Sequence, residues 1–279
     1  MGLTYIQIGS WNIKHLGSQP TEDQRSQSVY ALTDHIEMAG VDVLAIQEVY
    51  DTSFGSYRNE HLDQTCALLH EHTGYEWMYA LLPNRDPEDN SQLCGYLWNN
   101  SLIQLDKAEA IPVDFKKGDL WLWDRRPHAV KFTTRNEIMG KQRSFVTVAL
   151  HMKANTGGSK DREKRTLEAA ELVKNVPWII EKMEDESLIL LGDTNILGSW
   201  EKAAELIVEA GFNDLNSEDS PTYAGGKAPF DRIFVRDGRV EFKYSRQYVL
   251  RSSNESAHLG YLSDHYLVKT SIKIYVDDN

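Results

Sequence analysis

The sequence predicts an α/β protein in which two mixed β-sheets pack against each other and helices cover them. Two observations indicate this class. Strand and helix patterns alternate in the first part of the chain, whereas several strand patterns follow one another later without helices between them. The 41% of hydrophobic residues among 279 positions also suffices for the large core that such a sandwich buries.

The first part of the chain holds the alternating patterns. Apolar residues at helical spacing, from Val29 to Ile36, follow a capping-box sequence at residues 21–24 and precede Gly40, a typical helix end. A second helix pattern ends at Gly74 in the same way. The predicted order is a strand from Leu3, a helix over 21–40, a strand over 41–48, a helix to 74, and strands over 75–82 and 95–98.

The second half contains a long amphipathic helix between two strands. Apolar residues from Leu167 to Ile180 lie on one face of a helix over 161–183, which Pro177 is expected to kink. The predicted order is a strand over 145–151, this helix, a strand over 187–193, a short helix over 200–210, and strands that begin near Asp231, Val240 and Tyr266.

The charge and the lack of targeting patterns limit the functional classes. The 42 acidic and 30 basic residues give a net charge of −12, the opposite of the basic footprint of a tight, sequence-independent DNA binder. A hydrolase that meets a phosphate transiently remains compatible, because bound divalent cations supply local positive charge. The sequence has no transmembrane run and no signal peptide at Met1, so we expect a soluble protein that is cytoplasmic or exported with its signal removed.

Two cysteines, Cys66 and Cys94, exclude a disulfide framework of the small secreted kind. A single bridge between them and two separate buried thiols are both compatible with the sequence. No linker or repeat divides the chain, and the polar residues at its strand ends extend from Asn12 to His265. We therefore predict one domain over residues 1–279 and assume that it is a monomer.

Polar side chains end several of the apolar strand patterns. The most informative is Asp264-His265, which enters an apolar run near the C-terminus, where ionisable groups need a chemical reason. A histidine at a strand end is more often structural, but five other segments share the arrangement. Strands that end together deliver such side chains to one rim of a rigid scaffold. The six segments are Trp11-Asn12, Gln47-Glu48-Val49, Leu150-His151, residues 192–195, Asp231-Arg232-Ile233 and Ser263-Asp264-His265.

In this order, the six segments resemble those of the endonuclease/exonuclease/phosphatase superfamily, the DNase I-like metal-dependent phosphodiesterases. The resemblance extends from Ile8 to Val268. It implies a four-layered α/β sandwich of two packed mixed β-sheets flanked by helices, with the catalytic groove at one edge of the sheets. It also implies hydrolysis of a phosphoric ester with a divalent ion. Hard oxygen ligands suit Mg²⁺, with Mn²⁺ or Ca²⁺ as alternatives.

Glu48 is the primary candidate metal ligand, because a surface role is unattractive for a carboxylate that follows the buried run 44–46. Asn12 assists at the same position, and Asp264 contributes from the opposite side. Asn12 alone is also compatible with a turn.

His265 is the preferred general base, and Asp231 orients its imidazole. Asp193 and Asn195 align the attacking water and hydrogen-bond a phosphate oxygen. In the family, Asp193 is sometimes assigned the base or a second metal instead, and the sequence leaves this open. By themselves, residues 192–195 are also compatible with an Asx turn.

His151 resembles the second histidine of DNase-type members, which is protonated and assists the leaving group or the phosphate. The family pattern pairs it with a glutamate, and the aligned position here is Gln92. An amide cannot raise the pKa of the imidazole as a carboxylate does, so we expect weaker acid assistance.

Four aromatic or basic positions are candidates for substrate contacts. Arg126 resembles the phosphate-contacting arginine of the nucleolytic members, although an ordinary exposed arginine is the alternative. Tyr50 stands where DNase I-like chains often carry a basic residue, and its ring can stack on a base. Trp121 and Trp123 are either groove-lining aromatics or, as the safer interpretation, packing residues.

These residues predict a divalent-metal-dependent phosphodiesterase, in the first place a DNase I-like endonuclease that hydrolyses DNA with low sequence specificity. The first alternative is a phosphatase or phospholipase of the same fold, acting on an inositol phosphate or sphingomyelin. The Pro-x-Trp-Cys-Asp-Arg run of inositol phosphatases is absent, since Asp231-Arg232 follows Ala228-Pro229-Phe230. A catalytically silent binding module is the second alternative. It leaves unexplained why every expected metal and acid–base position except that of Gln92 is filled.

Overall fold

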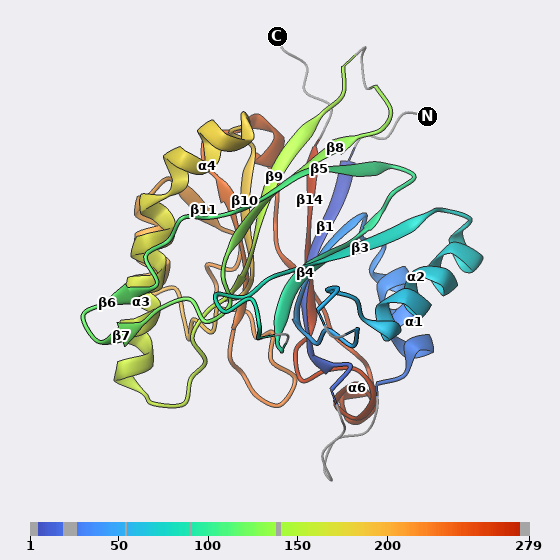
Figure 1. Cartoon of the computed structure of the whole chain (residues 1–279), viewed down its shortest axis with the longest axis horizontal. Coiled ribbons are helices and arrows are strands. Elements are labelled where there is room, and N and C mark those ends of the chain that lie inside the picture. Colours follow the sequence, from blue (N-terminus) through green and yellow to red (C-terminus); the bar gives the residue numbers. More distant parts are fainter. Residues whose placement is uncertain (1–4, 19–26, 54, 90, 138–140, 274–279) are drawn as a thin grey trace.

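The computed structural model describes residues 5–18, 27–53, 55–89, 91–137 and 141–273 of the chain. Two six-stranded sheets lie face to face (Figure 1). The first sheet has, in spatial order, β13 (Tyr248–Leu250), β14 (Leu267–Lys273), β1 (Tyr5–Leu16), β2 (Val43–Val49), β4 (Leu93–Asn99) and β3 (Trp77–Leu82). The second has β11 (Phe212–Asp214), β12 (Asp231–Arg236), β10 (Leu188–Asp193), β9 (Ser144–His151), β8 (His128–Thr134) and β5 (Ile103–Ala110). A separate hairpin pairs β6 (Lys116–Lys117) with β7 (Leu120–Trp121).

The inner faces of the two sheets share one hydrophobic core. Ile8 of β1 and Tyr96 of β4 come from the first sheet, whereas Phe132 of β8 and Ile189 of β10 come from the second, and all four are fully buried. The rings of Tyr96 and Phe132 meet edge to face with centroids 5.4 Å apart. Since side chains alternate between the faces of a strand, the remaining apolar residues point outward and require helices to cover them.

Helices cover the outer face of each sheet and complete four layers. On the first sheet lie α1 (Val29–Ala39) and α2 (Glu60–Thr73). On the second lie α3 (Ser159–Lys174), α4 (Val176–Met183) and α5 (Lys202–Glu209). This arrangement confirms the predicted sandwich. A sixth helix, α6 (Glu255–Tyr261), precedes β14. Within the described ranges, no helix has both the length and the apolar character needed to cross a bilayer.

Strand direction brings the polar strand ends together. Within each sheet the central pair is parallel, β1 with β2 and β9 with β10, so Asn12, Glu48, His151 and Asp193 lie at carboxyl ends. Antiparallel β12 begins at the same end, where Asp231 lies opposite Asp193 in the register. Antiparallel β14 begins there as well, directly after the segment that carries the Asp-His pair. These polar strand ends therefore lie together at one edge of the two sheets, as the sequence predicted.

Three predicted elements differ from the structure. The helix over 161–183 is not kinked but divided at Asn175, because Pro177 lies in the first turn of α4, where a missing backbone donor costs nothing. The strand expected at Val240 is a 3₁₀-helix (Val240–Phe242), since a turn at Gly238, with φ of 72°, leads the chain out of β12. The capping box at 21–24 lies outside the described residues, and α1 is capped by the side chain of Ser28.

The two cysteines are separate thiols, which settles the alternative that the sequence left open. Cys66 is partly buried in α2, and Cys94 is buried in β4. Burial raises the pKa of each thiol to about 12. Both side chains are therefore uncharged, unreactive packing groups at neutral pH.

Two buried histidines join the helices to β1. The ring of His35 in α1 lies 4.8 Å from Trp11 of β1 and 5.5 Å from His258 of α6, measured between centroids. His258 Nε2 donates to the carbonyl of His265 at 2.9 Å. Burial, and then the charge of His258, lower the pKa of His35 to about 4, and burial also lowers the pKa of His258. Both rings are neutral at pH 7.

We predict that His35 contributes to acid unfolding. Its pKa is about 4 in the folded state and near 6.5 when exposed, so the unfolded chain binds more protons between these values. Stability present above pH 6.5 is lost as the pH falls, by about 2 kcal/mol at pH 5. Urea unfolding at pH 7.5 and 5.0 should show a smaller difference for His35→Phe than for the native chain. The exposed His70→Phe is the control, and an equal difference in both variants would refute the assignment.

Candidate active site

Asn12 links the two sheets at the rim. It is fully buried at the end of the regular part of β1. Its amide Nδ2 donates to Glu48 Oε1 at 2.9 Å and to Asp193 Oδ2 at 3.0 Å, and its Oδ1 accepts from the backbone of Lys14 at 2.9 Å. One amide thus holds a carboxylate from each sheet. The turn that the sequence offered as an alternative role for Asn12 is present too. Its hydrogen bond from Lys14 N–H to Oδ1 orients the amide so that Nδ2 faces the two carboxylates.

Glu48 sits where β2 departs from regular pairing. Its φ of 59° is unusual for a residue with a side chain, and the register of β2 with β4 shifts around it. The carboxylate, 16% exposed, faces His15 Nε2 at 3.4 Å and His151 Nε2 at 3.7 Å. The backbone conformation therefore aims Glu48 into the space between the sheets.

Asp193 and Asn195 follow a glycine that no other residue can replace. Gly192 has φ of 149°, and a Cβ there would lie 2.0 Å from the carbonyl oxygen of Leu150. Asp193 Oδ1 accepts from the backbone N–H of Asn195 at 3.0 Å, so the Asx turn also exists. Asn195 Nδ2 donates to the carbonyl of Met152 at 3.2 Å. Burial, reinforced by nearby carboxylates, raises the pKa of Asp193 to about 7.

His265 forms the predicted pair with Asp231. Its Nδ1 donates to Asp231 Oδ2 at 2.9 Å, and its Nε2 points toward Asp193 Oδ2 at 3.9 Å. Burial lowers the pKa of His265, but the charges of Asp231 and Asp193 together outweigh burial and raise it to about 10. The imidazole is therefore a cation held between two buried carboxylates. Ser263 fixes this segment by donating to the carbonyl of Asn12 at 2.6 Å.

His151 lies in the site, but its partner is Arg125 and not Gln92. Arg125 Nη2 donates to His151 Nε2 at 2.9 Å, which requires a neutral ring protonated on Nδ1. That Nδ1 has no hydrogen-bond partner among the residues that the structure describes. The expected contact between Gln92 and His151 is therefore wrong. Gln92 lies in the turn before β4 with φ of 50°, and Arg125 occupies the hydrogen-bonding position on the His151 ring. Burial, and then the charge of Arg125, lower the pKa of His151 well below its ordinary value.

Arg126 occupies a different place from its predicted one. Its guanidinium lies over the ring of Phe115, 5.2 Å from the centroid. The chain bends at Asp124 and Arg125 before β8 begins, and Arg125, not Arg126, reaches His151.

Asp264 and Tyr50 flank the central cluster. Asp264 Oδ2 lies 3.2 Å from Lys14 Nζ and accepts from the hydroxyl of Tyr223 at 3.4 Å. Tyr50 is partly buried, with its hydroxyl 3.3 Å from His15 Nδ1. Neither Asp264 nor Tyr50, both in the described part of the chain, is hydrogen-bonded to Asn12. Both lie around the pair of carboxylates, Glu48 and Asp193, that Asn12 hydrogen-bonds.

Two groups of side chains have a donor arrangement that fits a metal ion. Glu48, His151 and Asp193 offer ligand atoms within 4.8 Å of one another, and so do Asp193, Asp231 and His265. The two carboxylates of Glu48 and Asp193 suit a hard divalent cation. Asn12 was expected as a further ligand, but it turns its Nδ2 and not its Oδ1 toward them, so it positions these carboxylates. The raised pKa of Asp193 shows that negative charge is crowded there, which a bound cation would relieve. The second group already holds the imidazolium of His265 as its cation, so the first group fits better.

Sequence reasoning missed three side chains of the site, namely Lys14, His15 and Arg125. Lys14 and His15 have φ of 50° and 56°, and this irregular backbone turns both toward the carboxylates of Asp264 and Glu48. A regular strand pattern gives no sign of such a turn. For Arg125, the Arg-Arg pair was the available signal, and the choice between its members depends on a bend before β8 that the sequence pattern does not show.

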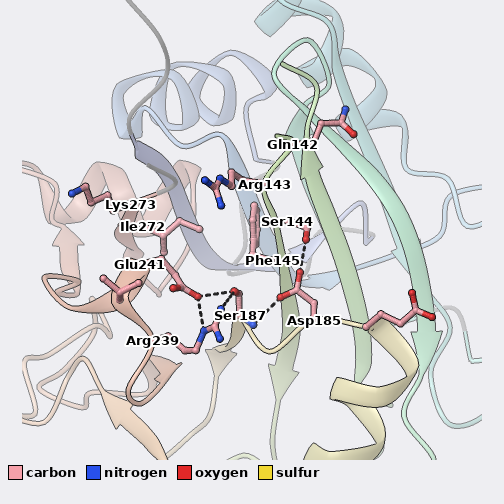
Figure 2. Close-up of a pocket in the computed structure, with 12 residues that line it drawn as sticks. Gln142, Arg143, Ser144, Phe145, Asp185, Ser187, Arg239, Glu241, Ile272 and Lys273 are labelled. Carbon is pink, nitrogen blue, oxygen red and sulfur yellow. Dashed lines mark hydrogen bonds and ion pairs between the residues drawn. The ribbon is translucent and has the colours of Figure 1, made fainter. Parts of the chain in front are cut away.

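A cavity of about 370 Å³ lies at the opposite end of the sandwich (Figure 2). Ser144 and Ser187 line it at the beginnings of β9 and β10, whose other ends form the site. Glu241 Oε1 accepts from Ser187 Oγ at 2.6 Å and from Arg239 Nε at 2.9 Å, while Ser144 Oγ donates to Asp185 (Figure 2). These groups satisfy one another and hold together the strand ends remote from the site.

Comparisons with known proteins identify the fold. Neither protein-family models nor curated proteins match the sequence. Among solved structures, the catalytic domain of human Nocturnin with bound sulfate has a TM-score of 0.64 at 17% identity, covering 97% of this chain and 95% of that one. An endonuclease/exonuclease/phosphatase from Bacteroides vulgatus has a TM-score of 0.66 at 12% identity, covering 98% and 100%. TDP2 from D. rerio, complexed with a single-strand DNA product, has 0.59 at 15%, covering 96% and 98%. The chain thus has the DNase I-like fold that the sequence predicted.

We predict that removing Arg125 changes the ionisation of His151. Loss of a cation 2.9 Å from Nε2 should raise the pKa of this imidazole in Arg125→Met, because a neighbouring positive charge disfavours protonation. NMR titration of the histidine ring resonances measures the shift. Arg126→Met is the matched control and should leave the His151 titration unchanged. An equal shift in both variants would show that the arginines act on the fold and not on the ring.

Proposed function

We propose that this protein is a divalent-metal-dependent phosphodiesterase, and within that class a nuclease that acts on DNA. The observation that carries the proposal is the joint placement of Glu48, Asn12 and Asp193 beside the His265–Asp231 pair, with contacts of 2.9 to 3.9 Å. A carboxylate cluster for a cation, a proton acceptor and a cationic donor are what phosphodiester hydrolysis requires. A binding module of the same fold has no need for this set.

The metal would be held principally by Glu48, and Mg²⁺ is the first candidate, with Mn²⁺ or Ca²⁺ as alternatives. Asn12 would position the Glu48 carboxylate through its Nδ2. When bound, such an ion neutralises charge on the phosphoryl oxygens and acidifies water. The chain itself supplies the fixed position of the carboxylates, because Asn12 is buried and bonded to both. Asp264, paired with Lys14, stands farther out, where it would adjust charge at the entrance.

The proton-transfer roles follow from the charges of the buried groups. Burial raises the pKa of Asp193 to about 7 in the metal-free site, and this carboxylate lies 3.9 Å from His265 Nε2, where it would accept a proton from the attacking water. His265, with a pKa of about 10, is already protonated, and because its Nδ1 donates to Asp231 it would donate one hydrogen bond through Nε2 to a phosphate oxygen. We therefore assign the role of general base to Asp193, an alternative that the sequence left open. Asp231 would orient the His265 ring by accepting a hydrogen bond from its Nδ1.

The phosphate would lie between His265, Asn195 and Arg125. Arg125 brings a permanent charge, and its contact with neutral His151 leaves other guanidinium N–H groups available for the phosphate oxygens. Asn195 offers an amide whose position is fixed by its bond to Met152. We assign to His151 the positioning of Arg125, in place of the acid role expected from resemblance, because a neutral ring with a lowered pKa is a poor acid.

Nucleic acid is the substrate class that we favour over inositol phosphates and sphingomyelin. One of the similar structures is TDP2 with a single-strand DNA product, and others are named endonuclease/exonuclease/phosphatase proteins. The decisive assay compares supercoiled plasmid, single-stranded DNA, RNA, sphingomyelin and an inositol polyphosphate in Mg²⁺, Mn²⁺ or Ca²⁺. Turnover restricted to the lipid or the inositol ester would overturn the nuclease assignment and keep the phosphoesterase.

We predict that chelation by EDTA abolishes hydrolysis and that Glu48→Gln lowers kcat by at least ~10²-fold, the scale of losing a major electrostatic stabiliser. The amide keeps the shape of Glu48 and removes its charge. Glu37→Gln, on the exposed face of α1, is the control and should retain full activity. Hydrolysis that persists undiminished in EDTA would contradict the proposed metal.

We also predict that His265 and Asp231 act as one unit. Each alanine variant should lower kcat/KM, and the double variant should be much less impaired than the product of the two losses, because the first change already removes the interaction. Losses that multiply in the double variant would mean that Asp231 does not act through the imidazole.

A further inference from the structure

The hairpin of β6 and β7 carries an exposed tryptophan beside the site. It lies next to α3 at the margin of the sandwich (Figure 1). Trp121 is 51% exposed, whereas Trp123, two residues later, is fully buried in the core beneath α3. The packing interpretation is therefore right for Trp123 and does not account for Trp121. An exposed indole of this size has no role in stabilising the core.

Cations surround this indole. The guanidinium of Arg85 lies 4.7 Å from the ring centroid, and the ammonium of Lys116, its cross-strand neighbour, lies 5.2 Å away. A second pair, Arg126 over Phe115, lies at the base of the same hairpin. In the described part of the chain, Lys116 has no ion pair with a carboxylate. Two cations thus lie over one exposed aromatic ring, and one of them, Arg85, is also paired with Asp124 at 2.9 Å.

The hairpin is connected rigidly to Arg125. Arg85 Nη1 donates to Asp124 Oδ1 at 2.9 Å, and Lys164 of α3 donates to the other carboxylate oxygen at 2.9 Å. Between Trp121 and Arg125 the chain has four steps, which span at most about 14 Å. The fully buried Leu122 and Trp123 anchor this segment. The backbone of Trp121 is therefore held close to that of Arg125, the arginine of the proposed phosphate position.

We propose that Trp121, with Arg85 and Lys116, binds an unpaired stretch of nucleic acid strand that flanks the scissile phosphodiester. This inference rests on the proposed function and names its substrate class, a single-stranded polynucleotide or strand end. A base that is not in a duplex offers its face to an indole, while the flanking cations face the backbone phosphates. In a duplex the bases are stacked on one another, so the indole could reach only their edges.

The test compares substrates that do and do not reach the hairpin. Hydrolysis of a single-stranded DNA and an RNA oligonucleotide, the blunt duplex of the same sequence, and bis(p-nitrophenyl) phosphate is measured with saturating Mg²⁺. Trp121→Ala should lower kcat/KM for the single strands by about 5- to 150-fold, the effect of removing one base-stacking aromatic. It should leave the small ester and the duplex within twofold, roughly the scatter expected for a surface substitution. Trp121→Phe, which keeps an aromatic face, should restore most of the loss.

Tyr244→Ala is the matched control. This tyrosine is 77% exposed with the ammonium of Lys243 5.5 Å from its ring, but it follows the 3₁₀-helix after β12, away from the rim. It should leave every substrate unaffected. Equal loss on the oligonucleotide and the small ester in Trp121→Ala would overturn the proposal, because the hairpin would then only support Arg125. So would an unchanged rate on single strands.

Binding measurements separate this proposal from the proposed function. Fluorescence anisotropy with the labelled single strand in Mg²⁺ should show weaker binding for Trp121→Ala and not for Tyr244→Ala. If the native protein hydrolyses the small ester but binds no single strand, the hairpin proposal fails while the phosphodiesterase stands. If it hydrolyses none of the esters and still binds through Trp121, the catalytic proposal fails and the strand-binding surface stands.

Discussion

The carboxylate of Asp193 is buried between the two sheets, and the arrangement of the site depends on how its charge is held there. Its side chain is 3% exposed, and its Oδ2 lies 3.0 Å from the Asn12 amide, 3.7 Å from His151 and 3.9 Å from His265. Burial without partners would keep this group protonated. The amide of Asn12 and the imidazolium of His265 offset that cost only partly, which leaves a pKa of about 7. An intermediate pKa of this kind is what a proton acceptor at neutral pH needs.

The fold explains why these groups meet. Two parallel strand pairs, one in each sheet, end at the same side of the sandwich, so Glu48 and Asp193 approach from opposite layers. Close approach then requires backbone that regular strands do not supply. Gly192 fits against Leu150 only because it lacks a Cβ, and Glu48 has a left-handed backbone conformation. Such strain persists only where the surrounding structure fixes it, and here the surrounding sheets are the most deeply buried part of the chain.

The sequence predicted more of the site than of its surroundings, for a physical reason. Polar residues at the ends of apolar strands are visible without coordinates, so Asn12, Glu48, Asp193, Asp231 and His265 could all be named. The pairing of His151 depends on which loop reaches it, and no local pattern showed that Arg125 would displace Gln92. The helix over 161–183 has one continuous apolar face, and only the position of Pro177 within a first turn divides it. The strand β5 escaped notice because it is a mostly half-exposed edge with Asp106, Lys107 and Glu109 among its residues.

Net charge is a poor guide to what this site attracts. At physiological ionic strength, charges separated by more than about 8 Å of solvent are largely screened from each other, so a phosphate responds to groups near it. Those groups include Arg125 and the imidazolium of His265, neither of which loses its charge near pH 7. His151 remains neutral, because burial and the adjacent guanidinium disfavour its proton. A permanently charged arginine, positioned by a neutral histidine, makes attraction of the phosphate independent of pH across the range in which Asp193 titrates. The acid–base behaviour of the site would then reflect Asp193 and the carboxylates around it.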